Sequence, residues 1–417
     1  MGYRRADTNC MVRLLPLRKL NRQQQALCES LRREAGRCWS EMLQAHIESR
    51  SGKWLSSVDL GKQFKGGYSL HSQTIQALAQ KLEANVDSAR ILRQDNPNIR
   101  YPYRFKRYQT IVWKRSAIRW TEAGRLSLSN GRHAPALVLP ISPEYVGADI
   151  RKVELIWRVD HYELCLTLDT GMKNPVLKES GQQAGVDLGE VNICAVATEA
   201  GNSLVVSGRA LRSVKRLRNK RHAALSSLIA RCKPGSKRRR KLQKSKRRAS
   251  ARLYRQQRDL LHKASRQVVE FCQTNNVQSI AVGDVRDIQD GTALGRMNNQ
   301  KVGQWPHGQF GRYMSYKARQ YGMWVEQVPE DYSTRTCSHC GEVMKSAPRG
   351  RIYTCPGCGA VTHRDVNGAS NICSRAKYGA YGCVQAQTVM YLRPLGRSRA
   401  FDTGPRCPEF SPGTLAL

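Results

Sequence analysis

The segment AGVDLGEVNICAVATEAGNSLVVS (residues 184–207) decides the fold of this chain. Its two apolar runs are separated by Glu199-Ala200-Gly201-Asn202, a turn sequence that predicts a β-hairpin. Asp187 lies within the first run, where Val186 and Leu188 should face one side of the strand and Asp187 the other. A carboxylate in an apolar strand is costly unless a partner or a metal ion offsets its charge. Asp187 is therefore a candidate metal ligand.

The sequence that follows the hairpin extends the same unit. Residues 209–275 are basic, carry apolar residues at helical spacing and are interrupted at Pro234-Gly235, which predicts an antiparallel helical pair. Residues 279–285 and 323–328 are predicted strands, with a helix over 310–321 between them. The order hairpin, helices, strand, helix, strand, with acidic residues near several strand ends, is that of an RNase H-like α/β fold. We expect this domain to comprise residues 181–333 and 361–375.

Two further domains are expected before the hairpin, so the chain is predicted to be a multidomain α+β protein. Residues 20–99 predict a helical domain, with one helix capped by Asn21 and a second from about Ser72. Residues 1–19 and 100–180 contain short segments rich in β-branched and aromatic residues, which predict a small antiparallel barrel or sheet. Residues 376–417 become rich in Pro and Gly, and we expect a partly disordered tail.

The charge of the chain indicates a polyanionic partner. Among 417 residues, 70 are Lys or Arg and 32 are Asp or Glu, a formal net charge of +38. Between Arg212 and Lys263 there are 21 cations and one acid, Asp259. Charge spread over several domains favours nucleic acid over a membrane surface. With no apolar run of about 18 residues and no secretion signal, we expect a cytoplasmic, nucleoid-associated protein of a prokaryote.

Two groups of residues are candidates for binding nucleic acid. Residues 100–114 interleave cations with aromatic side chains, which can hold phosphates and stack on bases; a domain junction with ordinary core aromatics explains the pattern equally well. The basic helices would contact the phosphates of a nucleic acid along a defined track, or bind DNA without a defined track. The candidates are Arg104, Lys106, Tyr108, Trp113, Lys114, Arg238, Arg239, Arg247, Arg248, Arg258 and Lys263.

Four of the fourteen cysteines form a metal-binding pattern. Cys337 and Cys340 belong to C-S-H-C, and Cys355 and Cys358 to C-P-G-C. Two such pairs at this separation predict a zinc ribbon over residues 334–360, with one Zn²⁺ held by four thiolates and no ligand position left open. Asp365 follows these cysteines, where helical spacing would point it back at the sheet. Because no ligand position is open, the zinc should be structural, and we expect it to fix the segment that carries Asp365.

The motifs together resemble the TnpB family of transposon-encoded RNA-guided DNA nucleases, which are related to miniature type V CRISPR effectors. The resemblance rests on G-V-D-L-G, Q-R-D-L-L-H-K-A-S (257–265), Y-S-T-R-T-C-S-H-C-G, C-P-G-C-G and D-V-N-G-A-S-N-I, and it covers about residues 184–373. It implies a RuvC-like nuclease domain interrupted by the zinc module. Residues 20–99 would be the helical recognition domain, and residues 1–19 and 100–180 a small β-barrel wedge domain. It further implies a guide RNA, a double-stranded DNA target beside a short motif, and divalent metal.

One catalytic position departs from the commonest family pattern. The strand over 279–285 usually carries Glu followed by Asp, whereas this chain has Gly283 and Asp284. Asp284 is a weak substitute because adjacent strand residues face opposite sides. Glu330 directly follows the 323–328 strand, and some family members with this Gly-Asp pair carry their glutamate there. We therefore expect Asp187, Glu330 and Asp365 to hold two Mg²⁺ ions, with Asp284 as an additional candidate.

The sequence leaves several functional readings open. The favoured one is an active Mg²⁺-dependent RNA-guided endonuclease, acting as a monomer or a dimer per guide. A nuclease-dead repressor of the same architecture would retain guide-directed binding, with Gly283 as a sign of lost catalysis. A transposase that joins DNA ends shares the carboxylate chemistry but explains neither the extensive basic surface nor the position of the zinc ribbon. The guide's source, from a transposon transcript or a CRISPR array, is not encoded in the chain.

Overall fold

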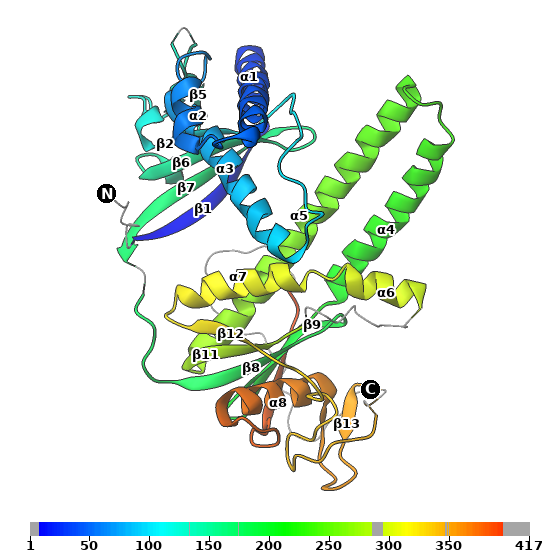
Figure 1. Ribbon diagram of the computed structural model, residues 1–417. Coiled ribbons are helices and arrows are strands. Elements are labelled where there is room, and N and C mark those ends of the chain that lie inside the picture. The colour runs from blue at the N-terminus through cyan, green and yellow to red at the C-terminus, as the bar shows by residue number, and fades with distance from the viewer. Residues whose placement is uncertain are drawn as a thin grey trace. The chain divides into compact units, whose positions relative to one another are not determined.

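The computed structural model describes residues 8–132, 134–173, 175–285, 295–346, 348 and 350–394 (Figure 1). The chain divides into two compact units at residues 174 and 175. The expected wedge boundary at residue 180 therefore lies within a few residues of the observed division. Within the described ranges, every helix is too short or too polar to span a membrane.

The N-terminal unit contains the two long helices expected from the sequence. Its helices are α1 (Arg22–Glu48), α2 (Ser57–Gln63) and α3 (Ser72–Asp95). Asn21 caps α1 as predicted: its side-chain oxygen accepts from the Gln24 backbone N–H at 2.8 Å, and the Gln24 side chain accepts from the Asn21 N–H at 3.1 Å. Cys28, Leu31, Met42 and their neighbours form the buried face of α1.

The β segments of this unit form two antiparallel sheets. The larger has the order β1-β7-β6-β2, and the smaller β3-β4-β5. The strands are β1 (Thr8–Leu17), β2 (Ile111–Lys114), β3 (Ile118–Trp120), β4 (Leu126–Leu128), β5 (Leu137–Leu139), β6 (Ile150–Trp157) and β7 (Tyr162–Lys173). Of the two expected arrangements, barrel or sheet, the described strands form open sheets.

The helices and sheets of the N-terminal unit share one hydrophobic core. Leu31 and Leu82 from the helices belong to the same buried cluster as Trp113, Leu126 and Leu164 from the strands. The helical region at 20–99 and the β region therefore pack as one unit around a common core. The physical reason is that neither layer buries its apolar face without the other.

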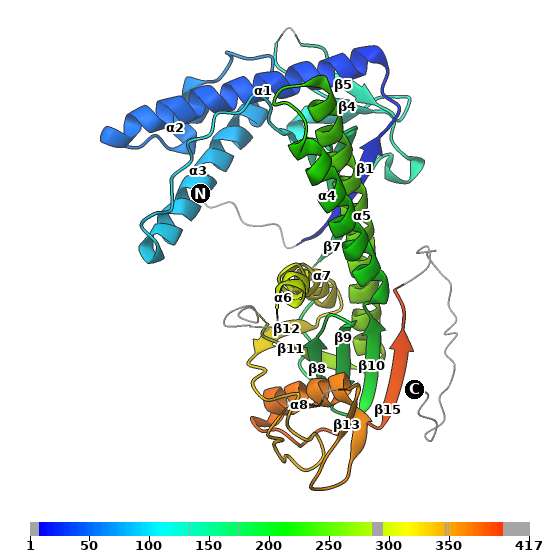
Figure 2. The ribbon, with the colours of Figure 1, turned by 90° about the vertical axis from the view of Figure 1, so that its right-hand side faces the viewer.

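The C-terminal unit is built on a six-stranded mixed sheet of order β12-β11-β8-β9-β10-β15 (Figure 2). β8, β9 and β10 form an antiparallel meander, β11 and β12 run parallel to β8, and β15 runs parallel to β10. The strands are β8 (Gln182–Leu188), β9 (Asn192–Thr198), β10 (Asn202–Ser207), β11 (Val277–Gly283), β12 (Trp324–Val328) and β15 (Thr388–Leu392).

Helices cover both faces of this sheet, as Figure 2 shows for α7 and α8 on opposite sides. The C-terminal helices are α4 (Arg209–Ala230), α5 (Lys237–Thr274), α6 (Arg296–Gly303), α7 (His307–Arg319) and α8 (Arg364–Tyr378). Leu261 and Phe310, from α5 and α7, share a core with Val186. Ala369 of α8 packs with Ala195 in a separate cluster. The predicted order of helical pair, strand, helix and strand is confirmed, with α6 as an additional helix before α7. The expected hairpin is instead a three-stranded meander, because its first apolar run turns after Leu188 and forms both β8 and β9.

Two elements complete the C-terminal unit. β13 (Ile352–Thr354) and β14 (Val361–His363) form a small antiparallel hairpin immediately before α8. β15 lies inside the segment expected to be a tail, and its parallel pairing with β10 makes it the sixth strand of the main sheet. Assignment of residues 388–392 to a tail is therefore wrong, whereas the expected disorder of 395–417 falls outside the described residues.

Candidate active site

The side chain of Asp187 projects from β8 on the face of the sheet that α8 covers. A Cβ added to Gly368 of α8 would lie 2.9 Å from Oδ2 of Asp187, so the helix passes directly over this carboxylate. Gly185, on the same face of β8, admits the backbone of α8, because any side chain there would collide with the Ala369 carbonyl. Val186 lies in the core on the opposite face, as predicted. Close packing of α8 on β8 thus places Asp187 beside the segment that carries Asp365.

Glu330 occupies the space in front of Gly283. β11 and β12 pair in parallel, with Gly283 opposite Val328, and Glu330 follows two residues after that strand ends. A Cβ added to Gly283 would collide with Oε2 of Glu330 and lie 3.0 Å from Cδ1 of Ile372. Gly283, which stands where the commonest family pattern has a glutamate, therefore leaves room for the Glu330 carboxylate. The backbone N–H of Asp284 donates to the Val328 carbonyl at 2.9 Å, which continues the pairing at the strand ends.

Asp365 lies in the first turn of α8 and is buried, with 8 % of its surface exposed. Its Oδ2 accepts hydrogen bonds from Asn192 at 2.8 Å and from Arg351 at 2.9 Å, and its Oδ1 accepts from Arg364 at 3.2 Å. The His363 side chain accepts from the Asp365 N–H at 3.2 Å and caps the helix. The three side-chain donors hold the carboxylate beside Asn192, the first residue of β9.

The pKa values of Asp187 and Glu330 are raised by burial and by neighbouring acids. Burial raises the pKa of Asp187 well above its usual range, and the carboxylates of Asp365 and Glu330 raise it further. Burial also raises the pKa of Glu330 to about 7, with Asp284 and Asp331 adding to the effect. Adjacent buried carboxylates resist simultaneous ionisation, and a bound divalent cation reverses that preference.

This donor set fits Mg²⁺, which prefers carboxylate oxygens. The acids are neighbours rather than a closed ligand set: within the described ranges, the four cysteines form the one group of three or more potential ligands gathered within 4.8 Å. The Asp365 carboxylate also forms ion pairs with Arg351 and Arg364. Glu330 and Asp365 thus lie close enough to Asp187 to act on it electrostatically, and Asp284 acts in the same way on Glu330. Their role as a metal-binding set stays a prediction.

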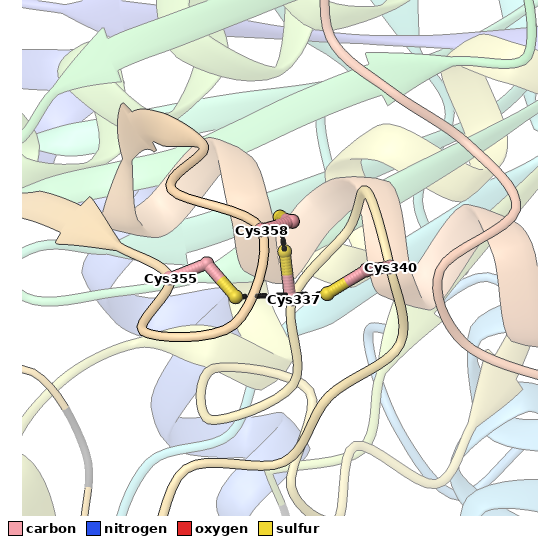
Figure 3. Close-up of side chains that lie close together, drawn as sticks. All are labelled: Cys337, Cys340, Cys355 and Cys358. Carbon is pink, nitrogen blue, oxygen red and sulfur yellow. Dashed lines mark hydrogen bonds between the residues drawn. The ribbon is translucent and has the colours of Figure 1, made fainter.

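The four cysteines form the second predicted site (Figure 3). Their sulfur atoms lie within 4.8 Å of one another, with 3.7 Å between Cys337 and Cys358 and 3.6 Å between Cys340 and Cys355. Zn–S bonds of about 2.3 Å in a tetrahedron require S···S separations of about 3.8 Å. The arrangement therefore fits one Zn²⁺ with all four positions filled by thiolates. Gly341 and Gly359 have positive φ values of 76° and 72°, which lets the chain turn after each cysteine pair.

Two asparagines that the sequence reasoning did not single out connect α8 to the zinc module. Asn367 accepts from the Ser338 N–H at 2.9 Å and donates to the Thr336 carbonyl at 2.7 Å. Asn371 donates to the carbonyls of Ser333 and Thr336 at 2.8 and 2.6 Å. Both side chains are fully buried. They tie the first cysteine loop to the helix that carries Asp365, and their i, i+4 spacing in D-V-N-G-A-S-N was the available signal.

The nucleic-acid candidates of the N-terminal unit differ in accessibility. Arg104 is exposed, and Lys114 donates to Gln80 at 3.0 Å. The Lys106 ammonium lies 4.3 Å from the ring centroid of Trp39, and Tyr108 has the guanidinium of Arg32 at 5.1 Å. Trp113 is fully buried and donates its ring N–H to Asn130 at 3.2 Å, so its assignment to base stacking is wrong. The exposed aromatic side chains of this segment are Tyr103 and Phe105.

The candidates on the basic helical pair lie along α5. Arg238, Arg247 and Arg248 are exposed. Arg239 donates to the Cys232 carbonyl at 3.1 Å, which links α5 to the end of α4, and Lys263 pairs with Asp259 at 2.7 Å. Arg258 is half-buried. The exposed members present positive charge to solvent, while Arg239 and Lys263 also serve the structure of the pair.

Two family models match parts of the C-terminal region. Residues 164–289 match OrfB_IS605, described as "Probable transposase", and residues 307–372 match Cas12f1-like_TNB, described as "Cas12f1-like, TNB domain". The first match contains Asp187 and Gly283, and the second contains Glu330, the four cysteines and Asp365. The resemblance to the TnpB family is thereby confirmed, together with a Cas12f-like zinc domain.

Individual relatives match shorter stretches. "TnpB-like protein L79" of Acanthamoeba polyphaga mimivirus is 31 % identical over 150 residues, which are 34 % of this chain and 28 % of that protein. "CRISPR-associated endodeoxyribonuclease Cas12f1" of Sulfoacidibacillus thermotolerans is 26 % identical over 112 residues, 27 % of this chain and 25 % of that protein. Each match thus spans under a third of the relative.

One solved structure shares the fold over most of both chains. The protein in "Cryo-EM structure of the Cas12f1-sgRNA-target DNA complex" aligns with a TM-score of 0.57 over 84 % of this chain and 82 % of its own, at 13 % identity. At this identity the similarity concerns the fold alone.

Proposed function

We propose that this chain, which carries the OrfB/IS605 segment of the TnpB family and a Cas12f-like zinc domain, is an RNA-guided DNA endonuclease. It would cut double-stranded DNA complementary to its guide, beside a short flanking motif. The observation that carries the proposal is the convergence of Asp187, Glu330 and Asp365, which are far apart in sequence, on neighbouring strand ends and the start of α8.

The sheet supports a RuvC-like, RNase H-related nuclease domain. Its order β10-β9-β8-β11-β12, with an antiparallel meander followed by two strands parallel to the first, is typical of that fold. β8 carries Asp187, and the position after β12 carries Glu330. The Cas12f-like fold and the endonuclease named among the relatives point in the same direction.

Asp187, Glu330 and Asp365 would hold the magnesium ions. Two bound ions would supply activation of the attacking water and stabilisation of the leaving oxygen. The chain's own residues position the carboxylates: Asn192, Arg351 and Arg364 donate hydrogen bonds to Asp365, and Gly283 leaves room for Glu330. Asp284, next to Glu330, is an auxiliary acid rather than a member of the central set.

The remaining parts would bind and position nucleic acid. The zinc site is structural, because the four thiolates fill the tetrahedron and α8 is tied to the first cysteine loop through Asn367 and Asn371. The exposed arginines of α4 and α5 would contact the guide–target duplex and the RNA scaffold through phosphates. Sequence specificity would come from guide pairing, and the protein would recognise duplex shape and the flanking motif.

A nuclease-dead repressor is the second candidate, and Gly283 is the observation that favours it. Gly283 leaves β11 without an acid at this position. If Glu330 did not replace that acid, the residues proposed to bind magnesium would lack one carboxylate. In this chain the Glu330 carboxylate fills the space in front of Gly283. That contact supports a relocated glutamate and retained cleavage.

Cleavage by the purified ribonucleoprotein tests the proposal. The chain is co-expressed with the DNA that flanks its gene, and the complex is given a plasmid with a guide-matched target behind a randomised flank. Cutting in Mg²⁺ that is absent in EDTA and with Asp187→Ala is the expected result, and the cut products reveal the flanking motif. Guide-dependent binding without cutting would support the repressor instead. If neither occurs, the chain is only a zinc-containing nucleic-acid-binding protein.

A further inference from the structure

A pocket of about 320 Å³ lies beside Asp365 in the C-terminal unit. Its walls come from the start of β9, the ends of β10 and β15, the first residue of α4, and the β13–β14 hairpin. Figure 2 shows β10 and β15 side by side, with β13 near them. The pocket is thus closed on one side by the strand that the sequence did not predict.

The lining of the pocket is cationic. It includes Arg209, Arg351 and Arg393 and contains no acidic side chain. Arg351 is paired with Asp365 at 2.9 Å. Within the described ranges, no ion pair involves the guanidinium of Arg209 or Arg393, and both residues are exposed. Guanidinium groups gathered without a carboxylate of their own favour an anion, and the planar fork of arginine suits a phosphate.

The rest of the lining suits a base or a sugar. Tyr391 is 54 % exposed, and its ring meets that of His363 edge to face with centroids 6.0 Å apart. Val205 and Leu392 add apolar surface. Exposed aromatic rings beside arginines are the usual platform for an unpaired base. The volume lies at the lower end of the range for small-molecule sites, about 300 to 1,000 Å³, which fits one nucleotide and excludes a duplex.

The pocket adjoins the candidate active site through shared residues. Asn192 and Arg351 line the pocket and also donate to Oδ2 of Asp365 at 2.8 and 2.9 Å. A nucleotide bound in the pocket would have its neighbouring phosphate next to Asp365. That phosphate would be a second anionic partner for Arg351, in addition to the carboxylate of Asp365.

We propose that this pocket binds one nucleotide of the single DNA strand that is cut, next to the scissile phosphate. Arg209 and Arg393 bind its phosphate, and Tyr391 contacts its base. This inference rests on the proposed nuclease function for the identity of the strand. It adds a strand-positioning site, built partly by β15, to the carboxylates that perform the reaction.

Cross-linking to a defined probe tests the pocket without requiring cleavage. The probe is a 12-nucleotide thymidine strand with one 5-iododeoxyuridine, irradiated with the full-length protein in the absence of added divalent ions. Mass spectrometry should locate a cross-link at Tyr391. Arg393→Gln and Arg209→Gln should each lower its yield about tenfold, the effect of one lost charge-assisted hydrogen bond. Arg319→Gln, which removes an exposed arginine of α7 away from the pocket, should leave the yield unchanged.

Three results separate the alternatives. Absence of a cross-link at Tyr391, or an unchanged yield in folded Arg393→Gln and Arg209→Gln proteins, overturns the pocket. Displacement of the strand by equal concentrations of thymidine 5′-monophosphate assigns the pocket to free nucleotides and also overturns the proposal. A cross-link that persists in Asp187→Ala, and in a parent protein that does not cut, supports the pocket even where the nuclease proposal fails.

Discussion

Gly283→Ala tests directly whether Glu330 has taken the place of an acid on β11. The added Cβ would collide with Oε2 of Glu330, approach its Cβ to 3.3 Å and lie 3.0 Å from Cδ1 of Ile372. The carboxylate is the free end of a flexible side chain, so it can swing away. Ile372 needs to shift by only a few tenths of an ångström. The folding cost should therefore be about 1 kcal/mol, the lower end for overpacking.

The effect on cleavage should be larger than the effect on stability. Displacing a group that holds or orients a metal ligand typically costs 10- to 100-fold in metal affinity or activity. We expect single-turnover cleavage by Gly283→Ala to fall by about that factor, with a partial recovery at high Mg²⁺. Loss of about 1 kcal/mol lowers the melting temperature by only about 2–4 °C for a unit of this size.

Two matched variants isolate the cause. Asp284→Ala alters the next residue of the chain, outside the central set, and should reduce cleavage less than Gly283→Ala. The exchange Gly283→Glu with Glu330→Gly returns the acid to β11 and should cut at least about tenfold faster than Glu330→Gly alone. A Gly283→Ala protein that cuts at the parent rate would refute the reasoning, as would Glu330→Ala cutting normally while Asp284→Ala does not.

Three further predictions concern pH, zinc and the helix that carries Asp365. Because the pKa of Glu330 is raised from 4.5 to about 7, the folded carboxyl keeps its proton across that window while the unfolded one loses it. Without Mg²⁺, this group should destabilise the protein progressively as pH rises from about 4.5 to 7; Glu330→Gln should flatten that part of the melting-temperature profile, and an unchanged profile would contradict it. Cys337→Ser and Cys358→Ser should lose zinc and soluble folding together, whereas a soluble zinc-free variant with normal cleavage would show that the metal is dispensable. Asn367→Ala removes two buried hydrogen bonds and should cost about 2–4 kcal/mol in denaturant unfolding, with zinc retained and cleavage reduced; normal cleavage would exclude a positioning role.

The parts of this protein that were predictable are those with local signals. Asn21 and its capping box define the start of α1, the apolar and acidic alternation around Asp187 defines the faces of β8, and the two CxxC pairs define the zinc site. Each signal depends on residues within a few positions of one another. The strand, helix and metal-ligand patterns of the sequence express such short-range requirements directly.

The parts that were missed depend on distant pairing. β15 is a five-residue strand whose one sheet partner in the described part of the chain, β10, lies about 190 residues earlier, so nothing within its own sequence defines its place. Trp113 belongs to a run of cations and aromatics, and its burial follows from packing against helices far away in the chain. The arginines around Asp365 are likewise assembled by the hairpin and helix together. Tertiary context decides these features.

Glycines argue for a maintained active site rather than a decaying one. At Gly185, Gly283 and Gly368 a side chain would meet the backbone of α8, the Glu330 carboxylate and the Asp187 carboxylate, respectively. Loss of catalysis through replacement of a strand glutamate by glycine would leave a void at the end of β11. Instead the space is filled by Glu330, which follows the neighbouring strand β12. The carboxylates of Glu330 and Asp365 both raise the pKa of Asp187. A carboxylate that is desolvated and placed beside two others is unfavourable for folding. A bound divalent cation would offset this cost, as the proposed nuclease function requires.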